Sequence, residues 1–550
     1  MSASTKSSSD DQILMAIGNF GRWQFLMFFV AGITLLPGTF PVLSMTFLNV
    51  KVNHWCGKPE ALSSMSTAEW RKTIDNDTGC DGQAKISGQI KWEMVHHLQN
   101  NTSTDTVSEE RVGDDLSVGS IECSGFDFDR STFDSTLSTE WNIICDDAYQ
   151  LSFSQSVYFG GMMIGVFVAG ILSDKFGRKR VLITSVLGFS VAGVLSSFST
   201  SYGIFLLCRF FVAAGSSGIL IIIMAYLLEM VGGKWTTILG MGVQFFWVLG
   251  WLILGVLAYF IRDWRQLTFV TSISGLLVII LHWVMPESPR WLLSIGRSDE
   301  AEQIIRRIAR TNTIELSEDW SLQPQIKSKD EGQFEEKSIT ELFKYPQLRA
   351  KTLILLVNWF SNSATYYALT LNSAALYGNI FVNFLVNGFM EIPAYSISIA
   401  LLLMSGRRVP YALCILMGGV SLLGVICIPS SYERATQVVA ISGKFFITIS
   451  FGVIYLYSSE MFPTVLRTSG IGACSLICRF GGISAAWIAL LSHYHPYLPT
   501  TIYGILAIFC GLIALFLPET KDEKIPDTIE ESEQNPLMSW REAFQGRHVT

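Results

Sequence analysis

Residues 170–180 read Gly-Ile-Leu-Ser-Asp-Lys-Phe-Gly-Arg-Lys-Arg, a short basic turn between two long apolar segments. Gly170 and Gly177 mark positions where we expect two helix ends to approach closely and the backbone to bend. Asp174 is short enough to cap a helix start or to pair with an arginine at a neighbouring helix end. Because basic residues beside membrane spans favour the cytoplasmic side, the turn is predicted to be cytoplasmic. Its basic residues are Lys175, Arg178, Lys179 and Arg180.

The chain around this turn has the composition of a membrane protein. Apolar residues make up 50% of its 550 residues and charged residues only 15%, below the roughly 25% of a soluble domain. Segments that can cross a hydrocarbon core of about 30 Å as helices recur along the sequence, and we predict twelve spans. They lie at 23–48, 151–172, 180–199, 203–228, 237–260, 266–285, 351–374, 380–404, 409–429, 435–459, 467–492 and 500–517.

The polar segments between the spans set the domain organisation. A long loop splits the first half, and a second loop with 10 basic and 12 acidic residues separates the halves. This second loop is predicted to be cytoplasmic, with short helices such as the amphipathic run Ser298–Arg310 lying against the membrane. Both termini are predicted to be cytoplasmic, and the tail to be polar, acidic and flexible. The predicted parts are 1–22, 23–285 with the loop 51–150, 286–350, 351–517 and 518–550.

The loop 51–150 has the features of an extracellular domain. It holds 18 acidic and 8 basic residues between Lys51 and Asp147. Its glycosylation sequons are at Asn76, Asn100 and Asn101. Its cysteines are Cys56, Cys80, Cys123 and Cys145. An even number of cysteines in an extracellular loop predicts two disulfides, in one of three possible connectivities.

The two halves repeat the same signals six spans apart. Gly177-Arg178-Lys179 follows the second span and Gly406-Arg407-Arg408 follows the eighth. Glu229 ends the fourth span, and Glu460 ends the tenth. Such a repeat predicts a transporter built from two six-helix halves. No aspartate in the second half matches Asp174, so we expect the ion pairing at the turn to be stronger in the first half.

Several motifs together resemble solute carrier family 22, the organic cation, anion and zwitterion transporters of the major facilitator superfamily. They are Gly18-Asn19-Phe20-Gly21-Arg22, Thr139-Glu140-Trp141-Asn142, Glu391-Ile392-Pro393-Ala394, Gly443-Lys444-Phe445 and Glu460-Met461-Phe462-Pro463-Thr464 with Arg467. The resemblance implies an all-α membrane protein with 12 transmembrane helices in two six-helix bundles and a large extracellular loop. It also implies secondary transport across the plasma membrane by alternating access. Residues 259–265 and 380–395 look most similar to the organic cation/carnitine branch.

Four charged residues lie inside predicted spans, where ionisable groups are costly and usually line a cavity or pair with each other. Glu391 and Arg479 are 11 and 12 residues into their spans, roughly 17 Å deep at 1.5 Å per residue. Lys444 and Arg209 lie closer to span ends. Arg479 can receive a carboxylate through two parallel hydrogen bonds. Glu391 can offset a cationic head or couple to an ion, or it can be a structural partner of Lys444 or Arg479.

The resemblance narrows the substrate class. Arg479 follows Arg467 by twelve residues, a position where cation-selective family members typically carry Asp and where anion and carnitine carriers carry Arg. The implied substrate is a zwitterion with a carboxylate and a quaternary or protonated amine. Alternatives are a polyspecific organic cation or anion carrier and, from another class, a non-transporting ligand sensor with the same fold. Family position also favours Trp359, Tyr366 and Trp247 with Gln244 for binding the amine, because aromatic faces attract quaternary ammonium groups.

Other function classes lack the residues they need. The sequence has no nucleophile–base pair, metal cluster or nucleotide-binding fingerprint, so we expect no enzymatic activity, cofactor or nucleic-acid partner. Gly38 stands where sodium-coupled carnitine carriers have Asn, which argues against sodium coupling, and the coupling ion stays open. The expected partners are the lipid bilayer and a small organic ion, and the expected form is a monomer.

Overall fold

The structure is a computed structural model that divides into two compact units. The helical unit comprises Met1–Thr46, Phe153–Phe260 and Leu267–Thr550, and the loop unit comprises Phe47–Ser152 and Ile261–Gln266. The residue range of the loop unit nearly coincides with the polar loop 51–150 predicted from the sequence. The structure describes residues 9–538 except 51, 58–65, 67–69, 73–79, 81–82, 88–106, 112–116, 123–124, 318–319, 323–338, 373–377, 430, 522, 524–525 and 527.

Helices occur at all twelve predicted spans. In the first half they are α2 (Arg22–Leu48), α6 (Tyr149–Phe176), α7 (Arg178–Ser197), α8 (Tyr202–Glu229), α9 (Lys234–Gly242), α10 (Gln244–Phe260) and α11 (Trp264–Val278). In the second half they are α14 (Pro346–Asn372), α15 (Ile380–Phe389), α16 (Glu391–Met404), α17 (Arg408–Ile426), α18 (Glu433–Met461), α19 (Arg467–Leu490) and α20 (Leu498–Ala514). Among the described residues, nine helical segments are long and apolar enough to cross a membrane by length and composition.

Helix α14 is long but more polar than the other spans, and its polar side chains are buried in one network. The Tyr411 hydroxyl donates to Asn358 Oδ1 at 2.8 Å and accepts from Asn362 Nδ2 at 3.0 Å. Ser450 Oγ donates to Asn362 Oδ1 at 2.7 Å. These bonds join α14 to α17 and α18. Because buried amides are costly unless they are paired, the network explains how so polar a helix can lie inside the bundle.

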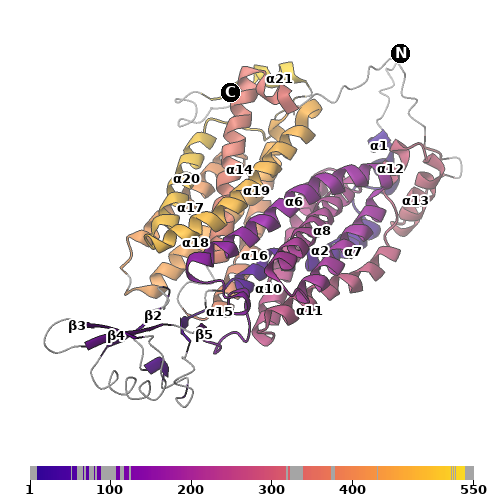
Figure 1. The fold of residues 1–550 in the computed structure, drawn as a ribbon. Helices are drawn as coiled ribbons and strands as arrows, with labels where there is room; N and C mark the ends of the chain where they lie inside the picture. The colour runs from indigo at the N-terminus through magenta and orange to yellow at the C-terminus, as the bar shows by residue number, and fades with distance from the viewer. Residues whose placement is uncertain are drawn as a thin grey trace. The chain divides into compact units, whose positions relative to one another are not determined.

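The helices of the second half pack together as one bundle. Helix α14 packs against α18, α19 and α20, and α17 packs against α18 and α20. Figure 1 shows α17 to α20, drawn in orange to yellow, side by side. In the first half, α7 packs against α8, and α10 reaches across to α15 and α16 of the second half. The α10–α15 contact is fixed by Trp251 Nε1, which donates to the Phe384 carbonyl at 2.9 Å.

Two predicted spans are each built from two helices. The fifth divides into α9 and α10 at Val243, next to Gly242, and the eighth divides into α15 and α16 at Met390. Pro393 has no N–H, so it cannot bond the carbonyl four residues earlier, and this accounts for the interruption at Met390. Broken helices of this kind line binding sites in transporters, where freed backbone groups and inward side chains are available.

Short helices cover one end of the helical unit. They are α1 (Ser9–Ile17), α12 (Pro289–Ser294), α13 (Ser298–Thr311) and α21 (Ile529–Gln534). Helix α13 matches the predicted amphipathic run, and it buries Ile305 and Ile308 against α12 and α1. The Asn312 side chain ties this layer together, because it donates to the Ile17 carbonyl and accepts from Trp23 N.

The prediction of a flexible tail is wrong for α21. Ile529 and Ser532 are fully buried. The Glu533 carboxylate accepts the N–H groups of Gln347 and Leu348 at 3.3 and 2.6 Å, and therefore caps the start of α14. Lys351 Nζ donates to the Ser532 carbonyl at 2.7 Å. An acidic side chain of the tail thus satisfies free backbone donors at a helix start.

The loop unit combines two small sheets with one short helix. Strand β1 (His54–Cys56) pairs antiparallel with β5 (Phe126–Phe128), and β4 (Ser117–Glu122) lies between β2 (Gln83–Ser87) and β3 (Val107–Arg111). Helix α5 (Leu137–Trp141) presents Glu140. Its carboxylate accepts from Trp264 Nε1 at 2.6 Å and from Arg265 Nε at 3.0 Å, which joins α5 to the first two residues of α11.

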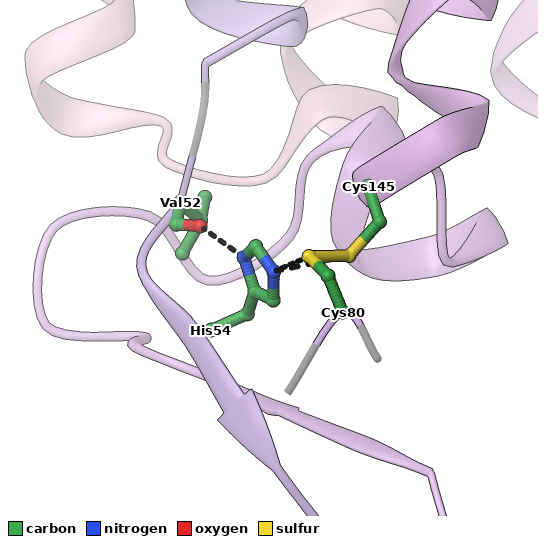
Figure 2. Close-up of a disulfide and its surroundings, with 4 residues drawn as sticks. All are labelled: Val52, His54, Cys80 and Cys145. Carbon is green, nitrogen blue, oxygen red and sulfur yellow. Dashed lines mark hydrogen bonds between the residues drawn. A yellow bond between two sulfur atoms is a disulfide. The ribbon is translucent and has the colours of Figure 1, made fainter. Parts of the chain in front are cut away.

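A disulfide between Cys80 and Cys145 holds the loop unit, as the sequence predicts. Figure 2 shows the His54 imidazole against this bond, with Nε2 3.9 Å from Cys80 Sγ and 3.8 Å from Cys145 Sγ. Cys56 is also disulfide-bonded. The fourth cysteine of the predicted disulfides, Cys123, and the sequons at Asn76, Asn100 and Asn101 lie outside the described residues.

Candidate functional site

Glu391 lies at the interruption between α15 and α16, and its side chain is buried with 1% exposure. The Tyr366 hydroxyl of α14 donates to Glu391 Oε1 at 2.6 Å. Lys444 Nζ of α18 approaches the same oxygen at 3.4 Å. Of the alternatives raised by the sequence, the structure therefore shows Glu391 paired with Lys444. The other oxygen, Oε2, has no hydrogen-bond partner in the described part of the chain.

Lys444 is held by charge and by aromatic faces. Its Nζ lies 3.8 Å from the centre of the Trp251 ring and 5.4 Å from that of Tyr366. Within the described residues this ammonium has no hydrogen-bond partner, although it is 1% exposed. A cation over an aromatic face is attracted by the ring quadrupole, most strongly by tryptophan.

Arg479 on α19 is a second buried cation, 7% exposed, in different surroundings. Its guanidinium interacts electrostatically with three neighbouring phenol side chains, those of Tyr158, Tyr367 and Tyr455. Among the described residues, no Asp or Glu lies within ion-pair distance of Arg479, and its Nε has no hydrogen-bond partner. A buried guanidinium without an acidic partner can accept a carboxylate from outside the chain.

Aromatic side chains from α14 and α18 form a continuous wall beside these charges. Trp359 contacts Tyr455 edge to face at 4.5 Å between ring centres, and Tyr366 stacks with Phe451 at 5.3 Å. Phe451 and Tyr455 contact each other at 5.6 Å. The Trp359 ring is fixed because its Nε1 donates to Ser458 Oγ at 2.8 Å. Tyr455 keeps 39% of its surface exposed, whereas Trp359 is buried.

The predicted residues Trp247 and Gln244 lie at the start of α10 and are both half-buried. Trp247 is one helical turn before Trp251, on the same helix as the ring that covers Lys444. In the described residues, no hydrogen bond or ring contact joins Trp247 or Gln244 to Glu391 or Arg479.

Arg209 on α8 is buried and bound to the first half. Its Nη2 donates to the Pro41 carbonyl of α2, and its guanidinium lies 4.5 Å from the Tyr158 ring centre. The Tyr158 hydroxyl in turn shares a hydrogen bond of 3.2 Å with Ser216 Oγ. These contacts indicate that Arg209 holds α2, α6 and α8 together.

The basic turn of the first half is an ionic cluster. Arg178 contacts Asp174 Oδ1 at 2.5 Å and Glu229 Oε1 at 2.9 Å. Glu287 accepts the N–H groups of Arg178 and Lys179 at 2.8 and 3.1 Å. Gly177 has a φ of 99°, and a Cβ there would lie 2.4 Å from the Glu287 carboxylate. Glycine is therefore required at Gly177 by both backbone conformation and space.

The prediction of a close approach is wrong for Gly170. A Cβ at this position, inside α6, would meet nothing within 4 Å. Arg180 is exposed on the first turn of α7. The helix bend is thus concentrated at Gly177, where α6 ends and α7 begins.

The second half repeats the cluster with the corresponding residues. Arg407 bonds Glu460 through Nε and Nη2, both at 3.2 Å, and its N–H donates to Glu519 Oε1 at 2.7 Å. The Arg408 N–H donates to Glu519 Oε2 at 3.2 Å. Arg407 Nη1 donates to the Leu402 carbonyl at 2.8 Å. In the first half, Nη1 of the matching Arg178 donates instead to the Asp174 carboxylate. Arg467 begins α19, after the turn that follows Glu460.

Comparisons with known proteins place the chain in a family. Residues 90–531 match the sugar (and other) transporter family. The organic cation transporter protein of Drosophila melanogaster is 32% identical, with 95% of this chain and 94% of that protein covered. Human organic cation/carnitine transporter 2 is 32% identical (95% and 93% covered), and rat solute carrier family 22 member 3 is 31% identical (95% and 95%). The chain belongs to solute carrier family 22.

Solved structures agree on the fold of this family 22 member. The inward-open xylose transporter XylE from E. coli covers 93% of this chain and 99% of its own, with a TM-score of 0.54 and 16% identity. A second XylE structure, bound to 6-bromo-6-deoxy-D-glucose, gives a TM-score of 0.56 at 17% identity. The chain therefore has the major facilitator fold, and it is a multi-pass membrane transporter and not an enzyme.

Sequence reasoning about this family 22 member missed two aromatic residues of the site. Phe451 is seven residues after Lys444 on α18, so it lies on the same helix face, and that spacing could have identified it. Trp251 was hidden in a fully apolar stretch of α10. Its contact with Lys444 depends on how α10 packs against the second half, and no sequence spacing reports that packing.

Proposed function

We propose that this transporter carries carnitine-like zwitterions, which combine a carboxylate with a quaternary or protonated amine, across the plasma membrane by alternating access. The observation that supports this most directly is the surroundings of Arg479, a buried guanidinium without an acidic partner in the described residues. Burying an unpaired charge is costly, and a substrate carboxylate that forms two parallel hydrogen bonds offsets that cost.

The second group of the substrate, the amine, would bind at the aromatic wall. Trp359, Tyr455 and Phe451 offer ring faces and edges within one cluster, and Tyr455 is partly exposed. Each aromatic face contributes about 0.5–2 kcal/mol to binding a quaternary ammonium. Carnitine has both groups, and the word carnitine stands in the name of one human relative.

Charge balance argues against a purely cationic substrate. The described charged side chains buried in the spanning helices are one acid, Glu391, and five bases. The bases are Lys444, Arg479 and Arg209, with Lys351 and Arg408 near helix starts. A simple cation would enter a region that is already positive, whereas a carboxylate would reduce the excess. A polyspecific organic cation carrier is the second candidate, and the names of the relatives from Drosophila favour it.

An uptake experiment separates these candidates. Cells that express the chain would be given labelled carnitine, choline or p-aminohippurate, with and without sodium. We expect saturable carnitine uptake, with weaker choline and p-aminohippurate uptake. Choline uptake that exceeds carnitine uptake would support the cation carrier. Thermal stabilisation by carnitine without uptake, in protein that reaches the cell surface, would indicate a non-transporting sensor.

A further inference from the structure

The disulfide of the loop unit has a histidine against it, and the three side chains together are a set of metal-binding groups. Figure 2 shows His54, on β1, facing the sulfur atoms of Cys80 and Cys145. Its ring nitrogen and the two Sγ atoms all lie within 4.8 Å of one another. Imidazole nitrogen and cysteine sulfur are the ligands that zinc prefers. The three residues are 26, 65 and 91 positions apart in the sequence, so no short motif reveals the cluster.

The His54 ring is held in the tautomer that a metal ligand needs. Nδ1 lies 3.4 Å from the Val52 carbonyl oxygen, which can only accept a hydrogen bond, so Nδ1 carries the proton in the neutral ring. Nε2 then presents a lone pair to the disulfide, whose sulfur atoms have no hydrogen to donate. A histidine that binds a metal through one nitrogen typically donates the other N–H to a group such as a backbone carbonyl, and His54 has this arrangement.

The distances around the disulfide are close to those of a tetrahedral metal site. Zinc–sulfur and zinc–nitrogen bonds of about 2.3 and 2.0 Å place a sulfur ligand about 3.5 Å from a nitrogen ligand. His54 Nε2 is already 3.9 Å from Cys80 Sγ and 3.8 Å from Cys145 Sγ. Only the two sulfur atoms would have to move apart, and this becomes possible once the bond between them is broken.

The position of His54 does not depend on this disulfide. His54 is part of the ladder between β1 and β5, and its ring contacts the Phe126 ring edge to face at 5.9 Å. Two residues later, Cys56 is fully buried, belongs to a different disulfide and accepts Trp70 Nε1 at 2.9 Å through its carbonyl. Cys80, by contrast, is exposed, so a reductant in solution reaches Cys80 before Cys56.

We propose that His54, Cys80 and Cys145 form a redox-gated metal site, which binds one zinc ion per chain when the disulfide is reduced. A dithiol reductant supplies the two electrons: its thiolate attacks the exposed Cys80 Sγ, the S–S bond breaks, and Cys145 leaves as a thiolate. The second thiol of the reductant then displaces Cys80, so that the reductant becomes a cyclic disulfide. The two cysteine thiolates and His54 bind zinc, water fills the fourth position, and two protons pass to the solvent.

The metal-bound form would keep the connection that the disulfide makes. Cys145 begins the short helical segment Cys145–Ala148, which leads directly into α6. In the oxidised chain the disulfide ties residue 80 to this segment. In the reduced chain zinc would do so, with His54 of β1 as an additional ligand. The tie would therefore persist under reducing conditions only where zinc is present.

The test is metal binding by the purified full chain in its oxidised and reduced forms. Accessible free thiols, among them the exposed Cys427, are first blocked with N-ethylmaleimide. Dithiothreitol is then used at a concentration that releases two thiols per chain, and is removed. We expect the reduced chain to bind one additional equivalent of zinc. Cobalt in place of zinc should give the charge-transfer absorption of cobalt–thiolate bonds, and the oxidised chain should not give it.

Substitutions separate this cluster from other groups of the chain. His54→Gln should bind zinc at least about tenfold more weakly, because the loss of an outer-shell partner alone costs about 10–100-fold. His495→Gln, at an exposed histidine of the helical unit, is the matched control and should leave zinc affinity unchanged. Cys80→Ser/Cys145→Ser should lose the additional equivalent. Where that variant does not fold, the unmutated chain, reduced and alkylated with iodoacetamide, takes its place.

Three results would overturn the inference. The first is a reduced chain that binds no more zinc than the oxidised chain. The second is equal zinc affinity in His54→Gln and the unmutated chain, because the thiols alone would then make the site. The third is an additional equivalent of zinc that persists after Cys80 and Cys145 are replaced or alkylated, because the metal would then be bound by other groups.

Discussion

Two buried cations of the second half have opposite surroundings. Lys444 is paired with Glu391, whereas Arg479 has no acidic side chain within ion-pair distance among the described residues and lies near phenols and a thiol. A lone buried charge costs several kcal/mol after relaxation. Evolution tolerates such a cost where a ligand relieves it, and transporters place intramembrane charges along their substrate pathways. The difference between these two residues therefore identifies Arg479 as the candidate anchor.

Replacing Arg479 with Lys should weaken carnitine binding. The charge remains but the two parallel hydrogen bonds are lost, so the affinity should fall by about 1–3 kcal/mol. The measurement is the concentration of carnitine that half-saturates uptake, corrected for protein at the cell surface. Choline, which has no carboxylate, serves as the control and should be affected little. Unchanged carnitine affinity would remove Arg479 from the site.

At the first turn, Glu229 should matter more than Asp174, although Arg178 contacts both. The Asp174 side chain is 73% exposed and that of Glu229 only 17%. Exposed ion pairs contribute about 0.2–1 kcal/mol, and removing one partner of a more buried pair costs more. Asp174→Asn should therefore lower the unfolding temperature of the purified protein less than Glu229→Gln. A larger loss of unfolding temperature in Asp174→Asn would show that solvent exposure does not decide how much each ion pair of Arg178 stabilises the protein.

At the scale of helices, hydropathy alone located every span but not the interruptions within them. The break at Met390 follows from Pro393, and it places Glu391 at the start of a new helix. The docking of α21 was also missed. Its six residues are mostly acidic or polar, and their role depends on the free N–H groups of Gln347 and Leu348 at the start of α14, which lie 186 and 185 residues before Glu533 in the chain.

The cap that Glu533 provides should stabilise the second half. Glu533→Ala leaves two N–H groups of α14 without their acceptor, and loss of a helix cap costs about 0.5–2 kcal/mol. We expect a lower unfolding temperature for the purified variant. The matched control is Glu530→Ala, at an exposed position of the same short helix. Equal effects of both substitutions would show that α21 acts through overall charge and not through the cap.

At the scale of the whole molecule, the repeat predicted from the sequence extends to details of bonding. The Tyr226 hydroxyl donates to the Pro286 carbonyl at 3.2 Å, and Tyr457 donates to that of Pro518 at 2.7 Å. The motif residues could be found from sequence because a turn of fixed length brings them together. The candidate site around Glu391 and Lys444 could be found only in part, because its side chains come from α10, α14, α16 and α18.

The loop unit should face the outside of the cell. Its disulfide between Cys80 and Cys145 requires an oxidising compartment, and the basic residues that mark the cytoplasmic side concentrate at other turns, those after the second and eighth spans. We expect an enzyme that removes N-linked glycans to increase the gel mobility of the surface-expressed chain. A chain with all three sequon asparagines replaced by Gln is the control. Full protection of an epitope inserted at 51–150 in intact cells would contradict this orientation.

The central claim is that a substrate carboxylate meets Arg479, and the most direct measurement is the ratio of carnitine to choline uptake in Arg479→Asp. The unmutated chain should prefer carnitine. The aspartate variant should repel carboxylates and accept cations, so the preference should reverse to choline. A surface-expressed Arg479→Asp transporter that still prefers carnitine would contradict the account.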